Sequence, residues 1–281
     1  MWKKCGLIFS KHHAQLPTIL HIEQKLFIFY STKDENNKSS IRKFAVNINN
    51  PKEILEDDSN VLNSGERGCF DDSGVMPACI IKDNEDIKLY FSGWNINKGN
   101  VPYGHGIGIA ISNNGGKSFH RLSNGPILDR NKYCPYLVNS PFIVKESKDL
   151  WRMWFCNGIG WEDNFPKYNI FEGKSNNGID WKIINKKLLG EENEAVSRPF
   201  IKDDSMWYSY KTKNSNYKIG FSKFYDNKWH RDDLLNNNLL STSKEGWDSE
   251  MVCYPQIYNN YMFYNGNSYG KTGIGYAVWT D

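Results

Sequence analysis

Five short stretches, each an apolar run with a proline near its start, recur along the chain and decide its fold. They read LPTIL (16–20), MPACII (76–81), SPFIV (140–144), RPFI (198–201) and YPQI (254–257). Successive prolines lie 60, 64, 58 and 56 residues apart. A period this regular predicts repeated supersecondary units.

Two further segments follow each stretch and also align between the repeats. The second segments are rich in aromatic residues: KLFIFYST (25–32), IKLYFSGWN (87–95), LWRMWFCNG (150–158), MWYSYKTK (206–213) and YMFYNGN (261–267). The third segments begin at Ile41, His105, Tyr168, Tyr217 and Thr272. Alternating β-branched and aromatic residues, separated by Asn, Gly, Asp and Ser, predict short antiparallel strands. Repeats with three clear strands and a weaker fourth are typical of propeller blades.

The last repeat ends at Asp281, soon after its third strand, whereas WKKCGLIF (2–9) supplies a spare strand at the other end of the chain. We expect residues 2–9 to complete the last blade, because closure removes an exposed sheet edge. No Pro/Gly/Ser linker interrupts the repeat. The sequence therefore predicts an all-β fold, a five-bladed β-propeller closed by the N-terminal strand, in a single domain over residues 1–281.

The charge and the cysteines of the sequence indicate which partners and which cellular location to expect. The net charge is +3, from 35 basic and 32 acidic residues, and the basic residues are scattered, which predicts no nucleic-acid partner. The six cysteines form no CxxC pair, and no apolar run is long enough for an export signal or a membrane span. We expect a cytoplasmic protein with reduced thiols; the sequence carries no indication of its oligomeric state.

Counting five residues back from each proline selects side chains that can ionise or hydrogen-bond: His12, Asp72, Tyr136, Glu194 and Glu250. The first strand of a propeller blade lines the central axis. The five side chains are therefore predicted to surround one pocket.

Three further residues near these five side chains are candidates for ligand binding. Arg198 can hold a carboxylate or phosphate of a ligand through two parallel hydrogen bonds, or form a structural ion pair with one of the carboxylates around the pocket. Asp248 can orient a neighbour or hold a loop, and His13, like His12, is suited to proton transfer or to a structural hydrogen bond. The spacing of these histidines indicates no zinc site.

The loops between second and third strands are rich in residues that bind sugars, since amides bond to hydroxyls and aromatic rings stack on a pyranose. Turn chemistry also enriches Asn and Gly, so both interpretations stay open. The candidates for carbohydrate contact are Trp94, Asn95, Asn157, Trp161, Lys211, Asn265 and Asn267.

The whole chain resembles the five-bladed β-propeller glycoside hydrolases of the arabinanase, levansucrase and invertase type. The turns SNNGGKSF (112–119) and SNNGIDW (175–181) carry part of this resemblance. The runs HHAQLPT, CFDDSGVMPACI, SRPF and GWDSEMVCYP resemble a branch of uncharacterised hydrolase-like propellers linked to bacterial surface-polysaccharide synthesis. The resemblance implies a carbohydrate or sugar-nucleotide ligand and no cofactor; a calcium ion on the axis is compatible with it but not indicated.

The resemblance is incomplete at the catalytic positions. Family 43 enzymes take an aspartate base, a second aspartate and a glutamate acid from the first three blades, and only Asp72 matches. His12 or His13 stands in the first blade, Tyr136 and Asn139 stand in the third, and the invertase motif WMNDPNG is absent.

Hydrolysis of a glycosidic bond requires two carboxyl groups, ~5 Å apart for retention or ~6.5–9.5 Å apart for inversion. Our hypothesis makes Asp72 the base, Glu250 the general acid and Glu194 a third acidic group in a glycosidase acting on a bacterial saccharide. Two alternatives stay open. One is a transferase or phosphorylase acting on a glycan or nucleotide-sugar precursor in surface-polysaccharide synthesis, and the other is a non-catalytic carbohydrate-binding propeller.

Overall fold

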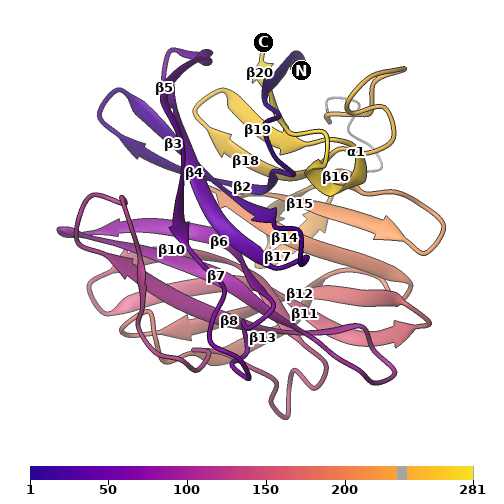
Figure 1. Ribbon diagram of the computed structural model, residues 1–281. Helices are drawn as coiled ribbons and strands as arrows, with labels where there is room; N and C mark the ends of the chain where they lie inside the picture. The colour runs from indigo at the N-terminus through magenta and orange to yellow at the C-terminus, as the bar shows by residue number, and fades with distance from the viewer. Residues whose placement is uncertain (233–238, 281) are drawn as a thin grey trace.

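A computed structural model describes residues 1–232 and 239–280, and nearly all of its regular structure is β (Figure 1). Antiparallel pairing joins the strands in consecutive sets of four. The first two sets are β2 (Gln15–Ile22), β3 (Lys25–Lys33), β4 (Ser39–Asn47) and β5 (Asn50–Leu62), then β6 (Gly74–Asp83), β7 (Asp86–Ile96), β8 (Tyr103–Ser112) and β9 (His120–Arg121). The next two are β10 (Val138–Ser147), β11 (Leu150–Glu162), β12 (Phe165–Ser175) and β13 (Lys182–Leu189), then β14 (Glu194–Lys202), β15 (Ser205–Thr212), β16 (Lys218–Tyr225) and β17 (Lys228–Arg231).

The last set takes strands from both ends of the chain. It consists of β18 (Cys253–Tyr258), β19 (Tyr261–Asn265), β20 (Ile274–Trp279) and β1 (Trp2–Phe9), with the one-turn helix α1 (Asn267–Gly270) between β19 and β20. Strand β1 runs antiparallel to β20, with Trp2 opposite Trp279 and Phe9 opposite Ile274. The two termini therefore lie side by side (Figure 1).

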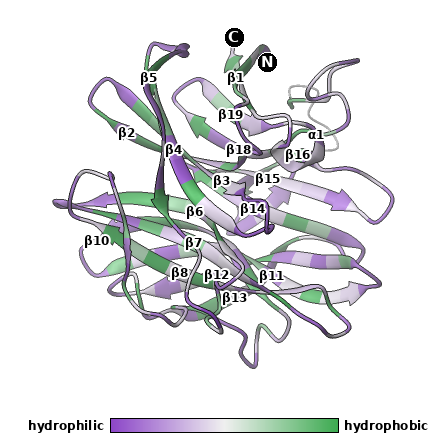
Figure 2. Cartoon of the chain, in the orientation of Figure 1, coloured by the Kyte–Doolittle hydropathy of each residue, from purple (hydrophilic) through white to green (hydrophobic). Residues whose placement is uncertain are grey.

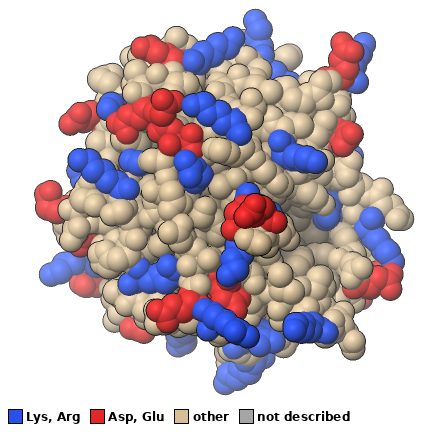
Figure 3. Space-filling model, in the orientation of Figure 1, with Lys and Arg blue, Asp and Glu red and all other residues tan. Residues whose placement is uncertain are grey.

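The first strands of the sets surround a common centre. Each contacts the first strand of the next set: β2 contacts β6, β6 contacts β10, β10 contacts β14, β14 contacts β18, and β18 contacts β2. The apolar residues concentrate in the strands and the polar residues in the loops (Figure 2). Acidic and basic side chains are interspersed over the face shown in Figure 3.

The hydrophobic core lies between neighbouring sets. One cluster joins Phe29 of β3 to Leu89 of β7, and the next joins Tyr90 of β7 to Trp151 of β11. A third cluster joins Trp154 of β11 to Tyr208 of β15. Large aromatic side chains supply much of the buried area that holds adjacent sheets together.

The repeated prolines mark an irregularity in each first strand. The pairing register shifts at or beside every one of them, as between Gln15 and Thr18 in β2. A proline has no N–H for the ladder, so it is found in sheets at edges and bulges. Four of the five residues before the prolines have positive φ: Leu16 (60°), Ser140 (49°), Arg198 (57°) and Tyr254 (60°). Such backbone costs about 1–3 kcal/mol per residue and persists where the surrounding structure holds it.

Within the described ranges, no helix has the length and apolar composition needed to cross a membrane.

Candidate functional site

A pocket of about 290 Å³ lies at the centre where the first strands meet. We call it the central pocket. Every set of strands contributes to its wall, which consists of Leu16, Met76, Tyr103, His105, Asn139, Ser140, Asn164, Pro166, Tyr168, Ser197, Lys211, Tyr217, Tyr254 and Tyr269.

The proline bulges build part of this wall. Leu16, Met76, Ser140 and Tyr254 each directly precede one of the repeated prolines, and all four line the central pocket. Ser197 lies one residue before Arg198 in the remaining first strand. The local backbone at each proline therefore presents side chains from five separate strands to one space.

Tyrosines form the largest group in the wall. The hydroxyls of Tyr103 and Tyr168 are 3.0 Å apart, and Ser197 Oγ donates a hydrogen bond to the Tyr217 hydroxyl at 3.4 Å. Burial raises the pKa of Tyr103, Tyr168, Tyr217 and Tyr254 above the usual value of 10. Their phenols are therefore protonated at neutral pH and can both donate and accept hydrogen bonds.

His105 and Asn139 form a hydrogen-bonded pair in the wall. The Asn139 side-chain nitrogen donates to His105 Nδ1 at 3.0 Å, which leaves the imidazole proton on Nε2. Tyr103 stacks on the imidazole with ring centroids 4.8 Å apart. Burial lowers the pKa of His105 to about 4, so the ring is neutral and serves as a hydrogen-bonding group at neutral pH.

Lys211 of β15 brings an ammonium group to the wall. Its Nζ donates a hydrogen bond to the Tyr269 hydroxyl at 3.1 Å and lies 4.9 Å from the ring centroid of Tyr217. No acidic side chain of the described residues lies within ion-pair distance of it. Aromatic rings and a phenol, rather than a carboxylate, therefore surround this positive charge.

Arg198 follows the wall residue Ser197 in β14 and is 2% exposed. Its Nη1 donates to the carbonyl oxygen of Pro77 at 2.5 Å, and its Nη2 donates to the carbonyl oxygens of Leu16 and Pro17 at 3.1 and 2.9 Å. A fourth hydrogen bond reaches Thr18 Oγ1 at 2.7 Å. Burial lowers the pKa of Arg198 to about 10, which still leaves it charged at neutral pH. The guanidinium thus ties β14 to β2 and β6.

The three predicted catalytic carboxylates lie outside the wall of the central pocket. Asp72 precedes β6, and its carboxylate accepts hydrogen bonds from the Gly68 N–H and the Ser73 hydroxyl, both at 3.0 Å. Glu194 pairs with Arg231 of β17 at 2.5 Å, and Glu250 is an exposed residue that precedes β18. None of the three, and no other described Asp or Glu, is in the wall of the central pocket.

Two predicted sugar-contacting residues do belong to this region. Lys211 is in the wall, and Trp161 packs edge-to-face on Tyr103 with ring centroids 5.1 Å apart. His13 is half-buried; burial and the nearby Lys33 lower its pKa. Its Nε2 has no hydrogen-bond partner among the described residues.

Several other predicted contact residues support the loops and sheets. Asn265 accepts a hydrogen bond from the Leu16 N–H and donates to the carbonyls of Ala14 and Gly273. Asn267 accepts hydrogen bonds from the N–H groups of Glu250 and Met251.

Asp248 is buried, with Lys4 Nζ at 2.6 Å and the Tyr264 hydroxyl at 2.9 Å. Trp94 donates its indole N–H to Ser39 Oγ at 2.7 Å and is 9% exposed. These two side chains have their polar partners within the protein.

The remaining predicted positions lie outside the wall. Asn157 is buried in β11, and its Oδ1 has no hydrogen-bond partner among the described residues. Asn95 lies on β7 opposite Gly104, Tyr136 is 45% exposed, and His12 Nε2 lies 3.4 Å from Asp58.

Sequence reasoning assigned no ligand contact to His105, Tyr168 or Tyr217, although a usable signal was present. The three residues begin the third segments of consecutive repeats in the sequence, and all three line the pocket. The residue before each repeated proline was a second such signal.

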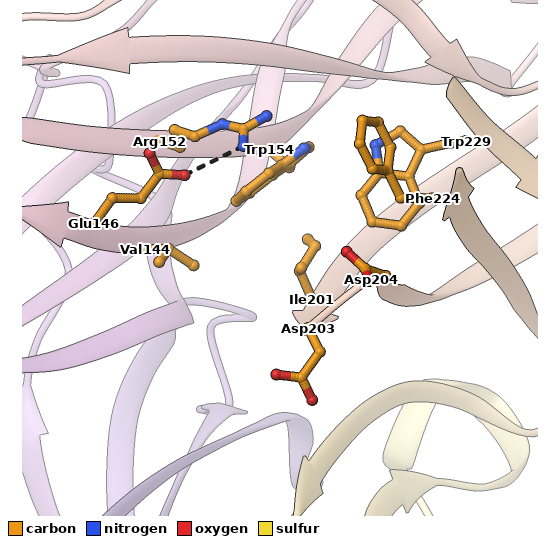
Figure 4. Close-up of a pocket in the computed structure, with 9 residues that line it drawn as sticks. All are labelled: Val144, Glu146, Arg152, Trp154, Ile201, Asp203, Asp204, Phe224 and Trp229. Atoms are coloured by element: carbon orange, nitrogen blue, oxygen red, sulfur yellow. Dashed lines mark hydrogen bonds and ion pairs between the residues drawn. The ribbon is translucent and has the colours of Figure 1, made fainter. Parts of the chain in front are cut away.

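Another pocket, of about 300 Å³, lies near the opposite ends of β10 and β14 (Figure 4). Trp154, Phe224 and Trp229 form an aromatic part of its wall, and Arg152 bridges Glu146, at 3.2 Å, and the buried Glu172. The carboxylates Asp203 and Asp204 complete its polar side. The arginine in this pocket is already neutralised by protein carboxylates, unlike the cations of the central pocket.

Solved structures with the same fold are glycoside hydrolases. An endo-arabinase from Bacteroides thetaiotaomicron VPI-5482 has a TM-score of 0.68 and 13% identity, covering 99% of this chain and 98% of that chain. A thermostable family-43 glycoside hydrolase has a TM-score of 0.64 and 14% identity, covering 99% and 93%. A structure described as a BT0996 RGII complex has a TM-score of 0.78 and 16% identity, covering 99% and 92%. At 13–16% identity the likeness shows that this chain shares the fold of these proteins, as the sequence resemblance predicts.

No protein-family model matches the chain. It is 31% identical, over an alignment of 301 positions, to the uncharacterized protein Rv1502 of Mycobacterium tuberculosis H37Rv, covering 99% of this chain and 98% of that protein. The uncharacterized protein MT1551 of M. tuberculosis CDC 1551 is equally similar. The chain belongs to the family of these two proteins.

Proposed function

We propose that the protein binds a saccharide in the central pocket. The observation that carries this proposal is the composition of the wall, which combines aromatic rings with hydroxyl, amide, imidazole and ammonium groups. Sugar rings present an apolar face to aromatic side chains and a set of hydroxyls to polar ones. Small-molecule sites are typically ~300–1,000 Å³, and a pocket of about 290 Å³ suits a single sugar unit or the end of a longer chain.

The architecture supports the same proposal. We infer that the sets of strands are the five blades of one propeller domain over residues 1–281, closed by the pairing of β1 with β20. The similar fold described as a BT0996 RGII complex carries a carbohydrate in its name, which is a further reason to test saccharides here.

Glycoside hydrolysis is the second candidate function, and the fold shared with glycoside hydrolases favours it. It requires the predicted pair Asp72 and Glu250, with Glu194, to act on a bond outside the described wall of the central pocket. A role in surface-polysaccharide synthesis, a sugar-nucleotide ligand, a transferase or phosphorylase reaction and a cytoplasmic location stay predictions.

One experiment separates binding from hydrolysis. Sugar binding by calorimetry and product release from oligosaccharides would be measured for the wild type, Tyr254→Phe, Asp72→Asn and Glu250→Gln. Binding in the central pocket predicts weaker affinity for Tyr254→Phe and unchanged affinity for the two amide variants. Turnover by the wild type that both amide variants abolish would favour hydrolysis. Undiminished affinity in Tyr254→Phe would contradict the proposed site.

A further inference from the structure

The charge balance of the central pocket is one-sided. The described wall contains the Lys211 ammonium and no carboxylate, and its only histidine is neutral at pH 7. A buried or half-buried charge normally has a partner of opposite sign, because removing it from water is costly. Among the described residues, the printed partners of Lys211 are the Tyr269 phenol and aromatic rings, with no carboxylate within ion-pair distance.

A second cation, Arg198, directly follows the wall residue Ser197 in β14. All four hydrogen bonds of the Arg198 guanidinium go to neutral oxygens, three carbonyls and one hydroxyl. One of those carbonyls belongs to Leu16, whose side chain lines the pocket. No described carboxylate lies within ion-pair distance of Arg198, so this charge beside the wall is not cancelled by an ion pair.

Two acidic residues at the turn between β11 and β12 are paired with other lysines. Glu162 lies 3.2 Å from Lys167 and 3.0 Å from Lys213, and Asp163 lies 2.8 Å from Lys213. Neither of these carboxylates is in the pocket wall, where Lys211 is the one charged residue among the described lining residues.

The hydrogen-bonding groups of the wall are suited to a negatively charged ligand. Raised pKa values keep Tyr168 and Tyr217 as O–H donors, and His105 presents an Nε2–H because Asn139 occupies its Nδ1. Hydrogen-bond donors that line one pocket together with a positive charge stabilise an oxyanion such as a carboxylate or phosphate.

We propose that the central pocket binds a saccharide that carries an anionic group, with Lys211 as its counter-ion and the buried Arg198 as a second positive charge beside the wall. This inference rests on the proposed function, since it assumes that the pocket is a sugar site. The inference specifies that the ligand is negatively charged, which favours uronates or sugar phosphates over neutral sugars.

The test compares matched sugars that differ in the anionic group. Calorimetry would measure the binding of galactose, galacturonate, glucose, glucuronate and glucose 6-phosphate to the wild type, Lys211→Met and Lys213→Met. Lys213 is the matched control, because its ammonium pairs with Glu162 and Asp163 and is not in the pocket wall.

We expect at least one acidic sugar to bind the wild type ten times more tightly than its neutral counterpart. Lys211→Met should lose that preference for the acidic sugar, and Lys213→Met should retain it. The uronate and phosphate arms identify which anion the pocket takes. Circular dichroism would establish that Lys211→Met folds, and Lys211→Arg, which keeps the charge, should preserve much of the preference.

Equal binding of neutral and acidic sugars would overturn the inference and leave the proposed function standing. A preference for acidic sugars that survives in Lys211→Met would also overturn it. Absence of binding by every sugar at millimolar concentration would overturn the proposed function itself.

Discussion

Arg198 Nη1 donates a hydrogen bond to the carbonyl oxygen of Pro77, 2.5 Å away, between residues 121 positions apart in the sequence. With its bonds to Leu16, Pro17 and Thr18, this one side chain joins three first strands at the centre of the molecule. Arg198 and Pro77 both belong to the repeated proline stretches. The repeat therefore provides the strand bulges and also the carbonyl groups that bind the arginine.

Replacing this arginine should destabilise the fold strongly. Arg198→Met removes the donor for three buried carbonyls and a hydroxyl, and each unsatisfied buried group costs about 1–3 kcal/mol. We expect the free energy of unfolding in urea to fall by about 3 kcal/mol or more. Arg130→Met is the control, because Arg130 is exposed and its loss should change stability by no more than about 0.5 kcal/mol. Equal stability of the two variants would refute the role of Arg198.

Strand β1 should contribute directly to the core. Phe9 is 6% exposed and stacks on Phe44 with ring centroids 4.3 Å apart. Phe9→Ala should therefore lower the free energy of unfolding by about 3–5 kcal/mol, as measured in urea. Leu7→Ala, at a position 38% exposed in the same strand, should cost far less. Similar small losses for both would argue against closure of the last sheet by residues 2–9.

His105 should make stability depend on pH below neutrality. Burial lowers its pKa to about 4 from the usual 6.5, so the unfolded chain binds the proton more readily. The free energy of unfolding should then decrease as the pH falls from 6.5 to 4, by at most about 3 kcal/mol from this group. Above pH 7 its contribution should be constant.

Urea unfolding of the wild type, His105→Gln and His120→Gln between pH 4 and pH 8 would measure this effect. His105→Gln should show a shallower loss of stability at acidic pH than the wild type. His120→Gln, a substitution at an exposed position, should give the same profile as the wild type. A wild-type profile in His105→Gln would mean that the imidazole is not held in its neutral form by the fold.

Much of the fold could be predicted from the proline stretches, since their period and the aromatic strands that follow depend on local properties of the chain. The three-strand pattern is present in every repeat, and tryptophans such as Trp151 pack between neighbouring sheets. These features arise from strand propensity and burial, which short segments express without knowledge of their neighbours.

The pocket wall was harder to predict because it depends on the bulges. Counting five residues back from a proline assumes a uniformly extended strand, but Asp72, Tyr136 and Glu250 all precede the strands β6, β10 and β18. The positive φ of residues such as Leu16 and Tyr254 then changes which side chain faces the centre. The alternation of side chains along an extended strand does not report such a local reversal, so only the equivalent positions in the repeats point to the tyrosines and His105.

Tyr254 provides the most direct test of the site at the centre. It lines the pocket, and its hydroxyl has no hydrogen bond to any described residue, so the group is available to a ligand. Tyr254→Phe should weaken sugar binding by about 0.5–1.5 kcal/mol, roughly threefold to tenfold, because it removes one hydrogen-bonding group and keeps the ring. Stability in urea should be nearly unchanged, since no bond within the protein is lost. Tyr225→Phe, 51% exposed and outside the pocket wall, is the control and should bind as the wild type does. Calorimetry with the acidic sugars would measure both variants, and equal affinities would remove Tyr254 from the binding site.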